Sequence, residues 1–234
     1  MKILFIGNTR LGDAILSTSI LNYYSGSNLS ITVVCSPLTE NIYKNFSNVK
    51  DIIAVNKKKR GKHWLEIYSL LESVCWDLVI DLRNSIISRL IRKKKILRIG
   101  KLNPNEHRVE SLCKLINTKK IISPRIPNKI EAKKEALKII SDKKLSLPIL
   151  AIAPVTNWQR KNWPLENFLF LVRSLTKNSK NKYCFNSVII LGNAQEKKKC
   201  DYLIDEIKDI NIKNLCGSCE INVVYALLQY CKLF

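Results

Sequence analysis

Strand-like and helix-like segments alternate along the whole chain, and this alternation constrains the fold more than any other feature. Residues 77–82, for example, are largely apolar, which suits a strand that is covered on both faces. The pattern predicts an α/β fold with βαβ units and parallel sheets. The predicted strands are 2–7, 30–35, 51–55, 77–82, 96–100, 149–154, 187–192 and 212–216. The predicted helices are 13–25, 38–47, 63–75, 84–93, 106–118, 131–144, 165–177, 194–208 and 219–230.

The alternation breaks in the middle of the chain, where 119–148 holds several prolines and no clear strand pattern. We therefore expect two Rossmann-like domains, 1–130 and 149–234, joined by a crossover helix and linker at 131–148. The first domain shows about five predicted strands. The second shows only three, followed by a helix that runs into a further strand, so it looks incomplete beside the five or six strands of a typical doubly wound domain.

Composition places few limits on function. The 46% of hydrophobic residues is ample for a core. No run of about 18 apolar residues exists, and the first residues are too polar for a secretory signal, which predicts a cytoplasmic protein. The eight cysteines are scattered among apolar neighbours, as buried small hydrophobes are. A single C-x-x-C at Cys216 and Cys219 is a poor zinc signal, and a redox role stays open behind the structural interpretation.

The formal net charge of +21 is strongly positive for a chain of 234 residues. Such a charge fits nucleic acid, an anionic membrane surface or a phosphorylated substrate. The lysines are spread along the whole chain, however, so most belong to solvated faces. A nucleic-acid module would need clustered cations with stacking aromatic residues on one face, and the sequence shows no such module.

The first glycine-bounded loop follows the first predicted strand and reads "IGNTRLGDAIL". Gly7 and Gly12 allow a tight turn at the carboxyl end of the strand, where α/β folds bind ligands. Asp13 stands where a P-loop would carry lysine, and a carboxylate there would repel a polyphosphate. Two interpretations remain: a helix cap, which spacing alone slightly favours, and a base that accepts a proton from an attacking hydroxyl.

The second loop follows the strand at 149–154 and reads "VTNWQRKNWP". Thr156 offers a hydroxyl, Arg160 and Lys161 are cationic, and Pro164 opens a helix at its first turn. Cations are disfavoured at a helix N-terminus unless an anion joins them. This loop is therefore a candidate anion site, with an exposed helix cap as the alternative.

The third loop, "LGNAQE", ends another strand at Gly192 and places Glu196 in the first turn of a helix. Its carboxylate either complements the helix dipole, worth about 0.3–1 kcal/mol, or accepts a hydrogen bond from a ribose hydroxyl. The spacing of the residues does not distinguish between these two roles of Glu196.

Together these segments resemble the ADP-heptose:lipopolysaccharide heptosyltransferase family, glycosyltransferase family 9. The resemblance is carried, in order, by "ILFIGNTRLGDAILSTSIL", "WDLVIDLRNSIISRLI", "NEHRVESLCKLI", "APVTNWQRKNWPLENFLFLV", "VIILGNAQE" and "LCGSCEINVVYALLQYCKLF". Each piece is weak alone, but their order and spacing are specific, and they span essentially the whole chain.

The resemblance implies a GT-B architecture and an inverting glycosyl transfer that needs neither a metal nor a cofactor. Asp13 matches the family's general base. Lys161 matches the lysine that holds the donor diphosphate, Thr156 lies where loop hydroxyls contact the phosphates, and Glu196 matches an acid that contacts the nucleoside. The implied donor is an ADP-heptose-like nucleotide sugar, and the implied acceptor is a phosphorylated lipid A–core sugar.

The basic loop "NKKKRGKHW" follows the third predicted strand. Three residues of this loop are expected to bind the acceptor, namely Lys57, Arg60 and Lys62. Two residues from other loops, Gly12 and Arg83, are expected to join them. The same cations suit anionic headgroups on the inner face of the cytoplasmic membrane, at about 1 kcal/mol each. A plain solvated loop is an equal alternative.

The family's second domain continues with an Asp-Ser/Thr-Gly-x-x-His loop that is absent up to Phe234. We therefore expect a C-terminally truncated chain, which is either a fragment of a longer protein or a natural truncation that has lost full transfer activity. The alternative is a Rossmann-type nucleotide-binding protein without transferase activity. A dinucleotide fold is less consistent with the sequence, because "GNTRLGD" lacks the middle glycine of G-x-G-x-x-G and no acid follows the second strand.

Overall fold

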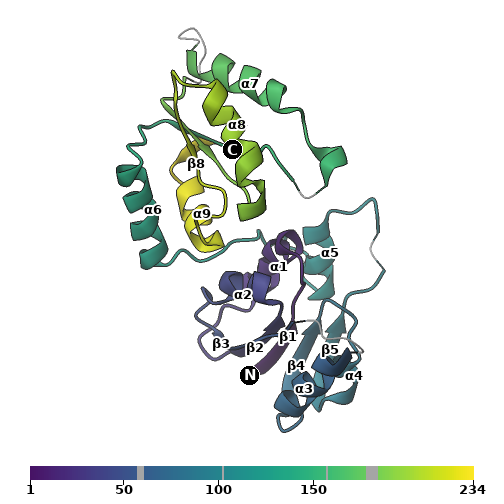
Figure 1. Ribbon diagram of the computed structural model, residues 1–234. Helices are drawn as coiled ribbons and strands as arrows, with labels where there is room; N and C mark the ends of the chain where they lie inside the picture. Colours follow the sequence, from purple (N-terminus) through teal and green to yellow (C-terminus); the bar gives the residue numbers. More distant parts are fainter. Residues whose placement is uncertain (57–60, 102, 157, 178–183) are drawn as a thin grey trace. The chain divides into compact units, whose positions relative to one another are not determined.

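The computed structural model describes residues 1–56, 61–101, 103–156, 158–177 and 184–234. The chain divides into two compact units, Met1–Pro127 and Asn128–Phe234. Each unit is built on its own parallel sheet (Figure 1).

The first unit holds a five-stranded sheet in the order β3-β2-β1-β4-β5, and all of its pairings are parallel. Its strands are β1 (Lys2–Ile6), β2 (Ser30–Cys35), β3 (Val49–Ala54), β4 (Trp76–Asp81) and β5 (Lys93–Arg98). Its helices are α1 (Leu11–Tyr23), α2 (Pro37–Tyr43), α3 (Lys62–Leu71), α4 (Ile87–Leu90) and α5 (Arg108–Leu115).

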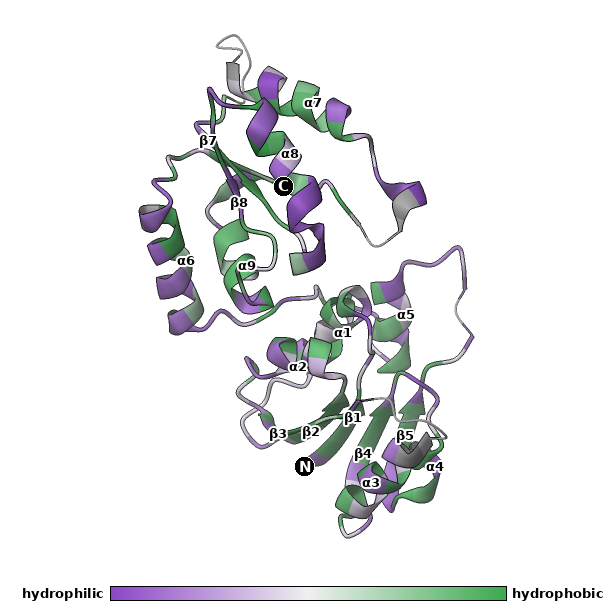
Figure 2. Ribbon diagram, in the orientation of Figure 1, coloured by the Kyte–Doolittle hydropathy of each residue, from purple (hydrophilic) through white to green (hydrophobic). Residues whose placement is uncertain are grey.

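The apolar runs of the central strands explain why this sheet is buried on both faces. Four residues of β1, Ile3 to Ile6, are fully buried. Ile6 and Val79 pack in one cluster with Ile67 and Leu71, which α3 contributes from one face. The hydropathy of the strands is accordingly high along β1 and β4 (Figure 2).

The second unit holds a four-stranded parallel sheet in the order β8-β7-β6-β9. Its strands are β6 (Ile149–Ile152), β7 (Ser187–Ile190), β8 (Asn211–Asn214) and β9 (Cys231–Leu233). Its helices are α6 (Ile130–Asp142), α7 (Leu165–Lys177), α8 (Lys197–Glu206) and α9 (Ile221–Leu228), with 3-10 turns η2 (Gln159–Lys161) and η3 (Ala194–Glu196).

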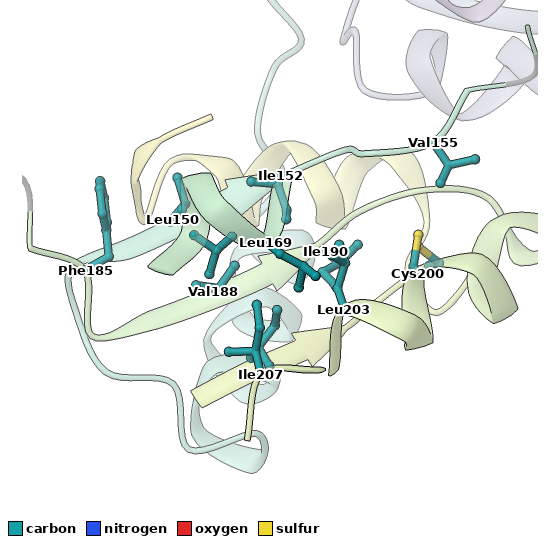
Figure 3. Packing of buried hydrophobic residues seen from close by; sticks show 13 residues of the cluster. Leu150, Ile152, Val155, Leu169, Phe185, Val188, Ile190, Cys200, Leu203 and Ile207 are labelled. Atoms are coloured by element: carbon teal, nitrogen blue, oxygen red, sulfur yellow. The ribbon is translucent and has the colours of Figure 1, made fainter. Parts of the chain in front are cut away.

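Two core layers sandwich this second sheet. On one face, side chains of β6 and β7 such as Leu150 and Val188 meet Leu169 of α7 and Leu203 of α8 (Figure 3). On the other face, α6 and α9 pack over the alternate residues of the same strands, for example Ile189. The alternation follows from the two-residue period of a strand, because successive side chains point to opposite faces of the sheet.

The further strand expected after the last helix is present, because β9 pairs in parallel with β6 and gives the second sheet four described strands. One expectation about the elements is wrong. The helix expected at 84–93 covers only Ile87–Leu90, since Ile91 is already extended and β5 begins at Lys93.

The early start of β5 has a physical reason. Lys93 to Lys95 are poor strand formers, but Lys93 pairs with Trp76 of β4 and Lys95 with Leu78. The ammonium of Lys93 also lies 3.1 Å from the carbonyl of Arg89 and 3.0 Å from that of Ile91, where α4 ends. Tertiary pairing therefore overrides local propensity here. Within the described ranges, no helix is long and apolar enough to cross a bilayer.

Candidate active site

Strand order identifies where each unit is expected to bind a ligand. In open parallel sheets, ligands bind outside the carboxyl ends of the strands, at the point where the chain reverses its direction of winding. In the first unit this point lies between β1 and β4, where Ile6 is paired with Asp81. In the second unit it lies between β6 and β9. The loops after β1, β4 and β6 are therefore the candidate binding loops.

Asp13 lies in the first turn of α1, just after the loop that leaves β1. The helix cap is Arg10, whose side chain makes no capping hydrogen bond, so Asp13 is not the cap. In the part of the chain that the structure describes, the Asp13 carboxylate has no side-chain or backbone partner, although its carbonyl lies 3.4 Å from Asn8 Nδ2. Of the two interpretations of Asp13, capping is thus excluded by the geometry.

A shallow, open pocket is lined by Arg10, Gly12, Asp13, Ile15 and Leu16. Asp13 is half-buried there and Gly12 is exposed. A methyl group on Gly12 would meet nothing within 4 Å, so packing in the described chain does not require a glycine at this position. Gly7 differs, because a Cβ there would lie 2.7 Å from the Tyr43 hydroxyl. Gly12 leaves the surface beside the carboxylate of Asp13 open.

Arg83 lies in the loop after β4, which a buried carboxylate organises. Asp81 is fully buried, and its carboxylate accepts hydrogen bonds from the backbone N–H of Arg83 (2.8 Å), the N–H of Ser85 (2.7 Å) and the Ser85 hydroxyl (3.0 Å). The Arg83 guanidinium carbon lies 5.2 Å from the ring centroid of Trp64 on α3. Burial of the guanidinium lowers the pKa of Arg83 below its usual value, and the nearby charge of Asp81 opposes this shift only in part.

Replacing Asp81 with alanine is expected to destabilise the first unit by about 2–3 kcal/mol, because two backbone N–H groups and a hydroxyl lose their acceptor. Urea denaturation measures the change in unfolding free energy. Asp77 lies at the other end of β4, where it pairs with Lys94 and accepts the exposed Lys2 N–H at 2.8 Å. Water can replace these exposed contacts, so Asp77→Ala is the matched control, with a smaller effect expected. Equal effects at the two positions would show that Asp81 does not organise the loop.

Part of the basic loop lies outside the described residues, namely Lys57, Lys58, Lys59 and Arg60. The backbone of Lys62 begins α3, and its side chain also lies outside the description. The expected acceptor contacts of Lys57, Arg60 and Lys62 therefore stay predictions.

The loop after β6 is closed by its own hydrogen bonds. The Thr156 N–H donates to Asn162 Oδ1 at 2.8 Å, and the Thr156 hydroxyl also lies 2.8 Å from that oxygen. The Lys161 N–H donates to the carbonyl of Trp158 at 2.8 Å, within the 3-10 turn η2. Thr156 and Lys161 are both exposed. Thr156 and Lys161 thus both lie in the described part of the loop after β6, and both contact the Trp158 carbonyl.

Glu196 belongs to a capping box after β7. Its Oε2 accepts the Asn193 N–H at 2.8 Å, and Asn193 Oδ1 accepts the Glu196 N–H at 3.0 Å. Glu196 therefore has a structural role at the start of η3. Only Oε2 is used in the box.

The Glu196 loop rests directly on the loop that follows β8. Gly217 has a φ of +68°, and its N–H donates to the Gly192 carbonyl at 2.9 Å. A Cβ on Gly217 would lie 2.5 Å from Ala194 Cα. Glycine is thus required at 217 both by its backbone conformation and by the close approach of the neighbouring loop.

The C-x-x-C pair is not a disulfide. All eight cysteines are free thiols, so Cys216 and Cys219 are not joined. Burial raises the pKa of Cys216, and burial raises that of its neighbour Cys200 to about 12, so neither thiol is activated at neutral pH. Among the described residues, no three His, Cys, Asp or Glu side chains gather in a way that would hold a metal ion.

Sequence reasoning missed three residues that matter here: Asp81, Trp158 and Gly217. The acid at the end of the apolar run 77–82 was the available signal for Asp81, because a buried carboxylate needs several donors. Trp158 and Gly217 act through contacts that no sequence pattern predicts.

Two Rossmann-like parallel sheets, each with polar loops at its switch point, place the chain in the class of doubly wound α/β proteins. A family model for glycosyltransferase family 9 (heptosyltransferase) matches residues 98–234, which is more than half of the chain. The chain therefore belongs to this family, and it is a glycosyltransferase.

Solved structures agree with this assignment. The glycosyl transferase family 9 structure from Veillonella parvula DSM 2008 has a TM-score of 0.82 at 17% identity, over 99% of this chain and 74% of that one. The structure of E. coli ADP-heptose lps heptosyltransferase II has a TM-score of 0.74 at 16% identity, over 100% of this chain and 78% of that one. The structure of E. coli heptosyltransferase WaaC with ADP has a TM-score of 0.70 at 16% identity, over 100% of this chain and 80% of that one.

At these identities the likeness shows the fold, and it confirms the predicted GT-B class with a partial second domain. No curated protein sequence matches the chain.

Proposed function

We propose that this glycosyltransferase moves heptose, or a related sugar, from an ADP-sugar to a phosphorylated lipopolysaccharide core acceptor. The proposal rests on the family, on the likeness to a heptosyltransferase solved with ADP, and above all on one observation. The carboxylate of Asp13 lies at the switch point of the first sheet and has no partner among the described residues.

The proposed chemistry is an inverting displacement without a metal. The acceptor hydroxyl attacks the anomeric carbon, the bond from that carbon to the diphosphate oxygen breaks, and ADP leaves. Asp13 takes the hydroxyl proton as general base. An unpartnered carboxylate suits this task, because no hydrogen bond has to break before it accepts the proton.

Donor binding is assigned to the second unit. The ammonium of Lys161 neutralises charge on the diphosphate and on the leaving group, and the Thr156 hydroxyl contributes a further hydrogen bond. Glu196 Oε1 accepts from a ribose hydroxyl while Oε2 remains in the capping box. The side chain of Lys161 starts at an exposed turn, so it reaches a phosphate without displacing core residues.

Acceptor binding is assigned to the first unit, with Gly12 leaving room beside Asp13 and with Arg83 binding an acceptor phosphate. Lys57, Arg60 and Lys62 are proposed to contact acceptor phosphates or anionic headgroups on the inner face of the cytoplasmic membrane. The protein is accordingly proposed to act in the cytoplasm, at that surface.

The test of the donor site is calorimetric titration with ADP in the presence of a chelator. We expect ADP to bind without Mg²⁺, and Lys161→Ala to weaken binding by about 10-fold, the loss of one charge-assisted contact. Lys134 on α6 is an exposed lysine of the same unit, so Lys134→Ala controls for net charge and should bind as the wild type does.

Binding that requires Mg²⁺, or equal affinity of Lys161→Ala and wild type, would reject this donor site. If the chain binds ADP but transfers no sugar from ADP-heptose to a core acceptor, the result would instead favour a nucleotide-binding protein without transferase activity.

A further inference from the structure

The backbone groups of Trp158 hold it in its loop through hydrogen bonds to Thr156 and Lys161. Its N–H donates to the Thr156 hydroxyl at 3.3 Å, and its carbonyl accepts the Lys161 N–H at 2.8 Å. The Thr156 hydroxyl also lies 3.2 Å from that carbonyl. None of these contacts uses the indole ring, so the loop does not need a tryptophan side chain to close.

The indole itself lies outside the core. Trp158 is 59% exposed and belongs to none of the buried clusters of the second unit. Its ring lies beside a cation, since Lys161 Nζ is 4.6 Å from the ring centroid. This distance is within the range of about 6 Å over which a ring face attracts an ammonium.

We propose that Trp158 is a positioning residue, whose indole holds the Lys161 ammonium in place for a diphosphate group. The inference rests on the proposed role of Lys161 in donor binding. A lysine side chain has a flexible four-carbon stem, and an ion pair with a free lysine must first restrict that stem. The ring restricts it before the ligand arrives, which lowers the entropic cost of binding.

The contact leaves the ammonium able to act. The ring occupies one side of the Nζ group, which has three N–H donors. No carboxylate pairs with Lys161 among the described residues, so its positive charge is not already neutralised by an acid. A phosphate oxygen therefore meets a cation that is both held and uncompensated.

The experiment titrates the full chain with two probes, ADP and inorganic pyrophosphate, which has no base. Trp158→Leu removes the ring face and is expected to weaken both probes by the same factor, about two- to fivefold. Trp158→Phe keeps a ring face and is expected to restore most of the affinity. Phe170 is 75% exposed on α7 and no cation covers its ring among the described residues, so Phe170→Leu is the matched control and should bind both probes normally.

A double-mutant cycle shows whether the ring acts through the lysine. In a Lys161→Ala background, Trp158→Leu should cause no further loss, whereas additive losses would show that the ring does not act through Lys161. A loss confined to ADP would mean that the indole stacks on the base and would overturn the inference.

Unchanged binding of Trp158→Leu would also overturn it. If Lys161→Ala still weakens binding in that case, the proposed donor site stands without Trp158. If the wild type binds neither probe, both proposals are rejected.

Discussion

Asp13→Asn is expected to lower the rate of sugar transfer by about 10²–10⁴-fold, the usual contribution of a positioned general base. Asparagine has the same shape but cannot accept the hydroxyl proton. Because the Asp13 carboxylate makes no hydrogen bond within the described chain, the fold loses only its interaction with the helix dipole, about 0.3–1 kcal/mol. The measurement is initial rates with saturating donor and acceptor, beside thermal unfolding and ADP titration.

Glu40 provides the matched control for this substitution. It is an acid in the first turn of α2, in the same unit, and it pairs with Lys44 at 2.7 Å instead of lining the pocket. Glu40→Gln therefore removes a comparable charge from a helix start without touching the proposed base. Full activity of Asp13→Asn would remove Asp13 as the base, and loss of ADP affinity would indicate a role in donor binding instead.

Gly217→Ala is expected to destabilise the second unit by about 2–4 kcal/mol and to displace the loop of Glu196. Two independent costs add here. A non-glycine residue at φ +68° is strained, and the new methyl group would lie 2.5–2.8 Å from Ala194 atoms, including its backbone. Hydrogen exchange of the β7 and β8 amides locates the loss in this unit, and ADP titration reports the displaced loop.

Gly100→Ala serves as the control for a glycine substitution as such. A Cβ at Gly100 would meet nothing within 4 Å, and Gly100 is not among the glycines with positive φ. Its stability is expected to stay within about 0.5 kcal/mol of the wild type. Wild-type stability and affinity of Gly217→Ala would show that the two loops move apart freely and that their packing does not hold Glu196.

Local pattern was sufficient for most elements and for the loops that carry the candidate site. Apolar runs bounded by glycine or proline predict strands such as β1, β6 and β7, because a strand buried on both faces needs an uninterrupted apolar segment. The polar residues that follow them, Asp13, Thr156 and Lys161, are then expected at the carboxyl edge by the geometry of parallel sheets alone. The basis of these predictions lies within a few residues of each position.

What the sequence by itself determined was therefore the α/β class, the existence of two parallel sheets and the family of the chain. Only the tertiary structure decided which strands are neighbours, that Lys93 begins β5, that β9 pairs with β6, and that Asp13 caps nothing. It also decided that Gly217 supports the loop of Glu196 and that the Trp158 ring meets the ammonium of Lys161. The reason is physical: pairing, close approach and side-chain contacts depend on where other segments and side chains come to lie in space, and local propensity carries no information about that.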